Sequence, residues 1–307
     1  MAKERFSIGT DPEFFLRDKE SGRLVSAIPY VKGTKNAPVS LPSGAQVQHD
    51  NVALEFATLP AKDGEDFVQK IRRAFMDIAK ILPEHLELDV NPAATFEKDQ
   101  LDHPEAKAFG CSPDYDAWEL QVNEPPEADE TDGFRSCGGH IHVGFVEGDG
   151  NDFLDDLVGK VQTVRMMDMF HGIVSTILDN SEEAVARRRL YGKAGCHRPT
   201  EYGVEYRTLS NFWLKSPTLV MLMDSLTSDV LRIMRGLSEE QLKDLDSPLP
   251  IFEEVGENIP EIINTGNSNR ATSVLEKIKK YMSDQTLDFL ETCMSKNTLE
   301  ISKEWGL

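Results

Sequence analysis

Two histidines that alternate with apolar residues are the first sign of chemistry in this sequence. They lie in the segment RSCGGHIHVG, residues 135–144, where a period of two predicts a β-strand. His140 and His142 would then share one face, about 6.6 Å apart along the strand, while Ile141 and Val143 point into the core. Such a face suits a metal ion or a phosphate group. It suits equally well two structural histidines with hydrogen-bond partners.

A carboxylate stands in a second apolar segment, FSIGTDPEFFL, residues 6–16. We expect a strand that is broken by a turn at Gly9-Thr10, with Glu13 on the same face as Asp11. A buried carboxylate without a partner is costly, so Glu13 either has a ligand or lies on a solvated edge strand.

A third carboxylate lies in VQHDNVALEFATL, residues 47–59, which we interpret as one strand. Its apolar face carries Val52, Leu54 and Phe56. Glu55 lies on the opposite face between Ala53 and Ala57, and small neighbours around one carboxylate favour the floor of a ligand site over a solvated sheet face.

The fourth polar segment is a basic island in an otherwise acidic chain, with positive residues at 187–189, 193, 198 and 207. Guanidinium groups pair well with phosphate oxygens. We therefore expect Arg189, Lys193, Arg198 and Arg207 to contact a phosphorylated cofactor, although the arginines at 187–189 also fit a solvated helix end. In the strand GVEYRTLSN, Glu205 and Arg207 share a face, either as a plain ion pair or as a metal ligand beside a phosphate contact.

Each of these four polar faces backs onto an apolar face, so one sheet could direct all of them at one cavity. Carboxylates with an imidazole suit Mg²⁺ or Mn²⁺ carrying the phosphates of a nucleotide, and the arginines would offset charge on the transferring phosphoryl group. The sequence contains neither a G-x-x-x-x-G-K-[ST] loop nor a G-x-G-x-x-G fingerprint. ATP would then bind on a sheet through metal ions and arginine.

Helical patterns separate these strands and would support them. Apolar stripes predict helices over 64–82, with Asp63 as N-cap, over 151–180, and over 216–236, with Ser216 as N-cap and Pro217 following it. A short helix is expected at 238–246, a loop-rich stretch at 247–271 and a further helix at 272–294. The pattern predicts an α+β fold in one domain, 1–307, with 238–307 as a C-terminal helical extension.

Composition narrows the classes of function. The chain has 307 residues, 39% of them hydrophobic, and a formal net charge of -20, which together indicate a globular protein that does not bind polymeric nucleic acid directly. No apolar run is long enough for a membrane span, and the first residues lack the apolar core of a signal peptide. The four cysteines, at 111, 137, 196 and 293, are widely spaced, so we expect reduced thiols and a cytoplasmic location.

Four of these segments together resemble a known family. GTDPEFFL, DNVALEFATLPA, CGGHIHVG and the run from YGKAG to EYGVEYRTLSNFW are similar to motifs of the phage-type COOH–NH₂ ligases (amidoligases), of the glutamine synthetase and γ-glutamate–cysteine ligase superfamily. The motifs span residues 9 to 213. The resemblance implies a curved, mainly antiparallel sheet with helices on its outer face, a glutamine synthetase-like catalytic fold. It also implies bound Mg²⁺ or Mn²⁺ and ATP-dependent amide bond formation through an acyl phosphate.

By position in those motifs, Glu13, Glu55, His140 and Glu205 resemble metal ligands. The role of His142 stays open between a ligand and a supporting residue. Arg207 resembles a contact to phosphate or acyl phosphate, with Arg198 as a second. The residues after 213 match nothing in the family.

The general base is expected to be Asp11 or Asp50, because they neighbour Glu13 and Glu55. The expected substrates are a small-molecule or peptide carboxylate and an amine, in the host cytoplasm if a phage encodes the chain; oligomers are possible. Two other functions fit the sequence: a zinc-dependent amidohydrolase, and a non-catalytic phage structural or regulatory protein. A covalent intermediate on Cys137 is a further possibility, against a simple space-filling role.

Overall fold

Two antiparallel sheets form the centre of the computed structural model, which describes residues 6–107, 114–123, 133–146, 148–245, 249–295 and 300–307. The first sheet has the strand order β1-β12-β14-β13-β9-β10. Its strands are β1 (Ser7–Thr10), β12 (Ile141–Gly144), β14 (Gly203–Tyr206), β13 (Cys196–Thr200), β9 (Tyr115–Asp116) and β10 (Gln121–Val122). Cys111 lies outside the described residues.

The second sheet has the order β3-β2-β6-β5-β4, and β7 also pairs with β2. Its strands are β2 (Glu13–Asp18), β3 (Leu24–Val25), β4 (Val39–Ser40), β5 (Gln46–Asp50), β6 (Ala53–Ala57) and β7 (Leu86–Asp89). A separate pair joins β8 (Ala93–Thr95) to β11 (Phe134–Ser136). The α+β class and the curved antiparallel sheet that the sequence predicts are confirmed.

The two sheets are joined where β1 passes into β2 at Asp11-Pro12. The segment of β6 continues alongside both strands: the Phe56 N–H donates to the Pro12 carbonyl at 3.3 Å, and the Thr58 N–H donates to the Thr10 carbonyl at 3.0 Å. The predicted break at Gly9-Thr10 is therefore wrong by two residues. The break falls at Pro12, which has no N–H to donate to a ladder.

The prediction of one strand over 47–59 is also wrong. The segment is a hairpin of β5 and β6, in which Gln48 pairs with Glu55 and Asp50 with Ala53. Asn51 makes the turn with a φ of 54°, a left-handed conformation that Asn tolerates better than most residues. This turn brings Asp50 close to Glu55, which a single extended strand would hold apart.

Two long helices begin where the sequence predicts. Helix α1 (Gly64–Ile81) is capped by the Asp63 side chain, which accepts from the Asp66 N–H. Helix α6 (Pro217–Arg235) is capped by Ser216, which accepts from the Leu219 N–H, with proline in its first turn. The apolar stripe of α1 packs on the second sheet, where Phe75 makes edge contacts with Phe14 and Phe56.

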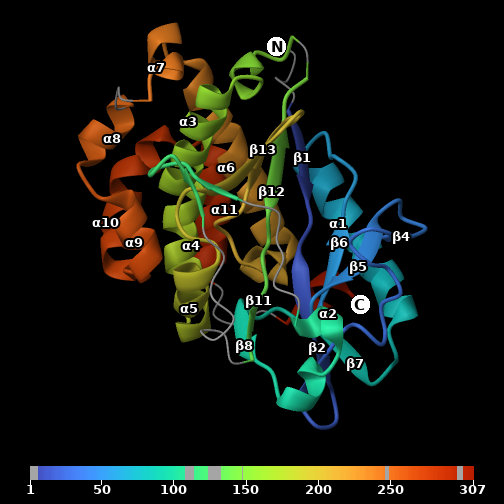
Figure 1. Ribbon diagram of the computed structural model, residues 1–307. Coiled ribbons are helices and arrows are strands. Elements are labelled where there is room, and N and C mark those ends of the chain that lie inside the picture. Colours follow the sequence, from blue (N-terminus) through green and yellow to red (C-terminus); the bar gives the residue numbers. More distant parts are fainter. Residues whose placement is uncertain (1–5, 108–113, 124–132, 147, 246–248, 296–299) are drawn as a thin grey trace.

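The helical segment predicted at 151–180 is several consecutive helices. They are the 3₁₀ turn η3 (Asp152–Leu154), α3 (Leu157–Met167), a π-helical segment η4 (Asp168–Gly172) and α4 (Ile173–Leu178). Helix α3 packs against β13 and β14. Its methionines, Met166 and Met167, are fully buried with Met169, as expected for core residues. Figure 1 shows α3, α4 and α6 as a layer beside the first sheet.

The C-terminal third is more helical than the sequence predicts. Its helices are α7 (Glu239–Lys243), α8 (Pro250–Val255), α9 (Ile259–Thr265), α10 (Ser268–Ile278), η6 (Lys279–Tyr281), α11 (Asp284–Ser295) and α12 (Ile301–Trp305). The stretch 247–271 was expected to be loop-rich, and in its described part this is wrong. Pro250 and Pro260 lie in the first turns of α8 and α9, where proline is favoured instead of disruptive.

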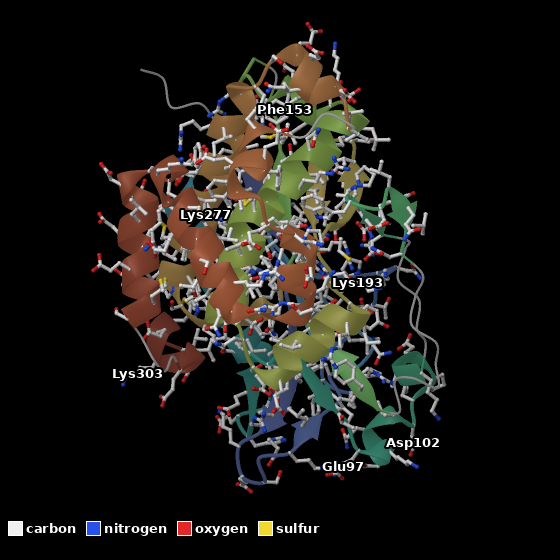
Figure 2. The ribbon with its side chains drawn as sticks, turned by 90° about the vertical axis from the view of Figure 1, so that its left-hand side faces the viewer. Glu97, Asp102, Phe153, Lys193, Lys277 and Lys303 are labelled. Atoms are coloured by element: carbon white, nitrogen blue, oxygen red, sulfur yellow. The ribbon has the colours of Figure 1, made fainter. Side chains whose placement is uncertain are left out.

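Shorter elements complete the chain: η1 (Lys98–Leu101), α2 (Pro104–Lys107), α5 (Glu182–Leu190) and η5 (Asn211–Lys215). Figure 2 views the molecule from the side of the C-terminal helices, with Lys277 on that side and Phe153 at the upper end. The last helix packs into the body, because Trp305 is buried against Phe75 and its indole N–H donates to the Leu214 carbonyl. Among the described residues, no helix combines the length and apolar character needed to span a membrane.

Candidate active site

Strand register places the predicted site residues in rows across the first sheet. Gly9 on β1 pairs with His142 on β12, His142 pairs with Glu205 on β14, and Glu205 pairs with Arg198 on β13. Cross-strand partners point to the same face. Three neighbouring strands therefore direct polar side chains to one face of the first sheet, next to Gly9.

Asp11, His142 and Glu205, which we call the His–carboxylate group, each offer a possible ligand atom, and these atoms all lie within 4.8 Å of one another. Nε2 of His142 is 3.1 Å from Oδ1 of Asp11. The Glu205 side chain is buried. Two carboxylates and one imidazole at this spacing can surround a divalent cation.

Positive charges offset the carboxylates of this group. Burial by itself would raise the pKa of Glu205, but the Arg207 guanidinium holds it below its usual value. Burial acts in the same direction on Asp11, and there His140 and His142 hold the pKa well below the usual range. Both acids are therefore ionised at neutral pH.

Glu13, Asp50 and Glu55 form the second cluster, which we call the three-carboxylate group. Their oxygen atoms also lie within 4.8 Å of one another, because Glu13 pairs with Glu55 across β2 and β6 and the hairpin turn brings Asp50 close. The Gly138 N–H donates to Oε2 of Glu13 at 2.6 Å. The Gln48 amide donates to Oε2 of Glu55 at 2.7 Å.

In this second group the carboxylate pKa values shift upward instead of downward. Burial raises the pKa of Glu55 well above its usual value, and the charges of Asp11, Glu13 and Asp50 raise it further. Burial also raises the pKa of Glu13, even though His140 acts against the shift. Carboxylates that repel one another in a buried position are stabilised by a bound cation.

His140 lies between the two groups. Its Nδ1 is 3.1 Å from Oδ1 of Asp11, 3.5 Å from Oε1 of Glu205 and 3.2 Å from Nη1 of Arg207. A Cβ on Gly138 would come within 2.3 Å of the other ring nitrogen, so only glycine fits there. The close ligand set includes His142, whose role the sequence left open, and the ligand role of His140 stays a prediction.

The basic residues of the island fall into three groups according to what their side chains contact. Arg207 contacts Glu205 and lies 3.4 Å from Asp114, and Arg198 lies 3.4 Å from Glu205. The side chains at 187 and 188 are buried and donate to backbone carbonyls, so these two are not part of a solvated helix end. Arg189 is exposed on α5 and Lys193 half-buried in the next loop; among the described residues no contact joins them to either group, and their phosphate roles stay predictions.

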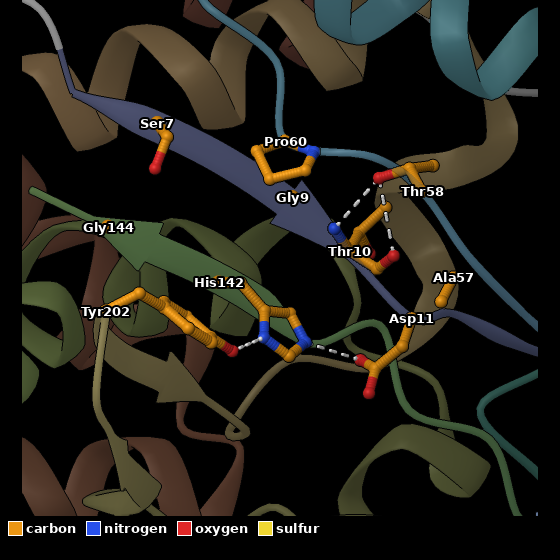
Figure 3. Close-up of a pocket in the computed structure, with 10 residues that line it drawn as sticks. All are labelled: Ser7, Gly9, Thr10, Asp11, Ala57, Thr58, Pro60, His142, Gly144 and Tyr202. Carbon is orange, nitrogen blue, oxygen red and sulfur yellow. Dashed lines mark hydrogen bonds and ion pairs between the residues drawn. The ribbon is translucent and has the colours of Figure 1, made fainter. Parts of the chain in front are cut away.

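A pocket of about 330 Å³ opens beside the His–carboxylate group (Figure 3). Asp11 and His142 lie at one end, and Tyr202 lies across from the segment that follows β6. Small and uncharged residues form the rest of the lining, which consists of Ser7, Gly9, Thr10, Ala57, Thr58, Pro60 and Gly144. No Lys or Arg side chain is among these lining residues.

Sequence reasoning missed two members of the clusters and one wall of the pocket. The sequence predicts Asp11 and Asp50 only as possible bases, although Asp11 is two residues before Glu13 and so follows the same period of two. Tyr202 was not singled out, and a lone tyrosine in a turn carries no signal. Cys137 is buried beside Glu13, and burial raises the pKa of its thiol well above the usual value, which disfavours a nucleophile there.

Comparison with known proteins supports the ligase interpretation. Residues 130–248 match the family model described as phage phiEco32-like COOH.NH2 ligase-type 2. This stretch carries the two histidines, Arg198, Glu205 and Arg207, but not the three-carboxylate group. No curated protein matches the sequence.

A solved structure, the crystal structure of a bifunctional glutathione synthetase from Pasteurella multocida, is similar with a TM-score of 0.49 and 12% identity. The similarity covers 98% of this chain and 48% of that one, so the chain spans about half the length of that protein. The matched family model supports a ligase that joins a carboxyl group to an amino group. Placement in the glutamine synthetase superfamily stays a prediction.

Proposed function

We propose that this protein is an ATP-dependent carboxylate–amine ligase, which activates a carboxylate as an acyl phosphate and transfers it to an amine. The observation that carries the proposal is the convergence of two acidic groups, Arg198 and Arg207 where the two sheets join. Residues from four segments of the sequence meet there, and they include the matched family stretch.

The three-carboxylate group fits a divalent cation. Its three acids crowd together within 4.8 Å, and the raised pKa values of Glu13 and Glu55 indicate charge that the protein itself leaves uncompensated. Oxygen ligands of this kind are those that Mg²⁺ and Mn²⁺ prefer. The His–carboxylate group supplies a second position. Cations held there would offset charge on the β- and γ-phosphates and the activated carboxylate.

Arg207 and Arg198 would contact the transferring phosphoryl group. Both lie beside Glu205, in the row that ends at the His–carboxylate group. Arginine at this position stabilises charge on the equatorial oxygens of a phosphoryl group in transfer. The phosphate chain of ATP would therefore lie over β12 and β14.

The pocket beside Asp11 and His142 fits the nucleoside part of ATP. It has no Lys or Arg lining residue and several small ones, which favours a neutral ring over a phosphate. From Asp11 to Ser7 the strand spans about 13 Å, which leaves room for a ribose and a base beyond the phosphates. The Tyr202 ring closes one side.

The carboxylate and the amine would then meet at the three-carboxylate group. Attack of the neutral amine nitrogen on the acyl phosphate carbonyl forms the amide bond and releases inorganic phosphate, and a base takes the amine proton. The strongly lowered pKa of Asp11 makes it a poor proton acceptor. Of the two predicted bases this favours Asp50, which lies within the three-carboxylate group.

The test is a screen of pooled carboxylates and pooled amines, scored by products whose mass increases only in the presence of ATP and Mg²⁺. We expect ADP and phosphate in amounts equal to the amide formed. Glu55→Ala should abolish this turnover while the circular dichroism spectrum is retained. Glu276→Ala, on α10 and exposed, should leave it unchanged.

Two results would overturn the proposal. Hydrolysis of amides without nucleotide, restored to a chelated sample by Zn²⁺, would indicate a metal-dependent amidohydrolase. A protein that neither binds Mg²⁺ or Mn²⁺ nor releases ADP with any pool would indicate a non-catalytic role on this fold.

A further inference from the structure

Tyr202 links the pocket to the His–carboxylate group. It lies in the turn between β13 and β14, and although 46% of the residue is exposed, its hydroxyl points inward and lies 2.5 Å from Nδ1 of His142. Figure 3 shows the continuous chain from the Tyr202 hydroxyl through the His142 ring to Asp11. The aromatic ring of Tyr202 also lines the pocket.

The two ring nitrogens of His142 therefore face different partners. Nδ1 faces the phenol, and Nε2 lies 3.1 Å from Asp11. A neutral imidazole carries one proton, and Nε2 can offer a lone pair to a cation only when that proton is on Nδ1. In that tautomer the phenol oxygen must accept the hydrogen bond. A partner on the second nitrogen is the usual way in which proteins orient a ligating histidine.

We propose that Tyr202 is a positioning residue, whose hydroxyl directs Nε2 of His142 at the cation position while its ring forms a wall of the nucleoside pocket. This inference rests on the proposed function. It implies that one side chain serves both the cation and the nucleoside, so the two contributions can be separated by removing first the oxygen and then the ring.

The opposite arrangement makes a different prediction. If Tyr202 donates its proton to Nδ1, the His142 proton lies on Nε2 and is donated to Asp11. His142 would then be a structural link with no lone pair for a cation, and the phenol would contribute to stability alone. The tautomer of His142 therefore decides between the two.

The first measurement is Mn²⁺ affinity by electron paramagnetic resonance, without nucleotide. It is made in a Glu55→Gln background, so that the three-carboxylate group contributes little. Adding Tyr202→Phe should weaken binding about tenfold or more. Tyr202→Leu should weaken Mn²⁺ binding equally and also weaken adenosine binding measured by calorimetry, whereas Tyr202→Phe should leave adenosine binding unchanged.

The second measurement is the ¹⁵N NMR spectrum of His142 at pH 8 in protein saturated with Mg²⁺. We expect a protonated Nδ1 and a bare Nε2, and a mixture of tautomers in Tyr202→Phe. The matched control is Tyr281→Phe, which removes a phenol contact to Glu254 in the C-terminal helices and should change neither measurement.

The outcomes separate this inference from the function on which it rests. Wild-type protein that binds no Mn²⁺ would overturn both. Mn²⁺ binding that is equal in Tyr202→Phe and its parent, or a protonated Nε2 on His142 in the Mg²⁺-saturated protein, would overturn the role of Tyr202 and leave the ligase proposal standing.

Discussion

The two acidic groups are neighbours where the two sheets join, yet the pKa values of their carboxylates are shifted in opposite directions. In the His–carboxylate group, arginine and histidine side chains of the protein hold the pKa values of Asp11 and Glu205 below their usual range. In the three-carboxylate group, burial and mutual repulsion raise those of Glu13 and Glu55. The first group is stable as it stands, whereas in the second His140 offsets the shift of Glu13 only in part.

This difference indicates that the two groups have different roles in the proposed reaction. A group whose charge is already balanced can receive phosphates without a large change in its own ionisation. A group with excess negative charge gains most from a cation, and that cation would be the one nearest the carboxylate and the amine. The following predictions test whether the two groups behave as differently as their surroundings suggest.

The largest expected effect is on turnover. Arg207→Ala should lower ATP-dependent amide formation by roughly 1000-fold, because it removes the charge that faces the transferring phosphoryl group. Steady-state kinetics measures this loss. Arg198→Ala, whose parent side chain is farther from Glu205, serves as the comparison and should cost about tenfold; equal losses would show that the two arginines are not distinguished as proposed.

The next effect is a difference of sign in stability, measured by urea unfolding with a chelator present. Glu55→Gln should stabilise the metal-free protein by about 1–2 kcal/mol, because it relieves repulsion among three crowded, half-buried acids. Glu205→Gln should destabilise it by about 3 kcal/mol, because Arg207 loses a buried partner. If both variants shift the unfolding free energy in the same direction, the contrast between the groups is wrong.

The pH dependence of unfolding should show the same contrast. The pKa of Glu55 is raised in the folded state, so its contribution to stability is present below about pH 4.5 and is lost as the pH rises through the folded pKa. That of Glu205 is lowered, so its contribution is present above about pH 4.5 and is lost as the pH falls through the folded pKa. Because Gln resembles a protonated acid, each Gln variant should match wild type at low pH and differ from it at neutral pH, where Glu55→Gln should be the more stable and Glu205→Gln the less stable protein.

The smallest effect concerns the pocket, which adjoins only one of the groups. A Cβ on Gly9 would meet its nearest neighbours at 3.8 and 3.9 Å, an ordinary contact distance, so Gly9→Ala should fold normally while its methyl group takes space in the pocket. We expect the KM for ATP to rise about fivefold, with Mn²⁺ affinity of the three-carboxylate group unchanged. An unchanged KM would place the nucleoside elsewhere.

The sequence predicts the elements whose signals are local. Asp63 and Ser216 mark the starts of α1 and α6 because capping depends on one side chain and the turn that follows it. Local patterns also predict which face Glu13, Glu55 and Glu205 take, since each alternates with apolar neighbours at a spacing of two, but their division between two groups depends on strand pairing. What the sequence does not predict depends on the turn at Asn51, a residue that fits a left-handed turn but also occurs in extended strands.

Contacts between distant segments also explain why the sequence does not predict the positions of Asp50 and Tyr202. Asp50 joins its group only because the hairpin reverses at Asn51, and Tyr202 reaches His142 only through the pairing of β12 with β14. The short helices after residue 249 begin with prolines, which can indicate either a loop or a helix start. Packing between distant segments determines whether such a segment is helical. In α12, for example, Trp305 packs against Phe75.

Asp11 and Glu13 flank Pro12 on a single stretch of backbone, and each belongs to a different acidic group. The distance between the two proposed cation positions is therefore set largely by covalent geometry and not by a hinge or a domain interface. A nucleotide and an acceptor bound at these positions would keep a nearly constant separation throughout the reaction. Inserting or deleting one residue at Pro12 would turn one of the two acids to the opposite face, and the two halves of the reaction would lose their common alignment.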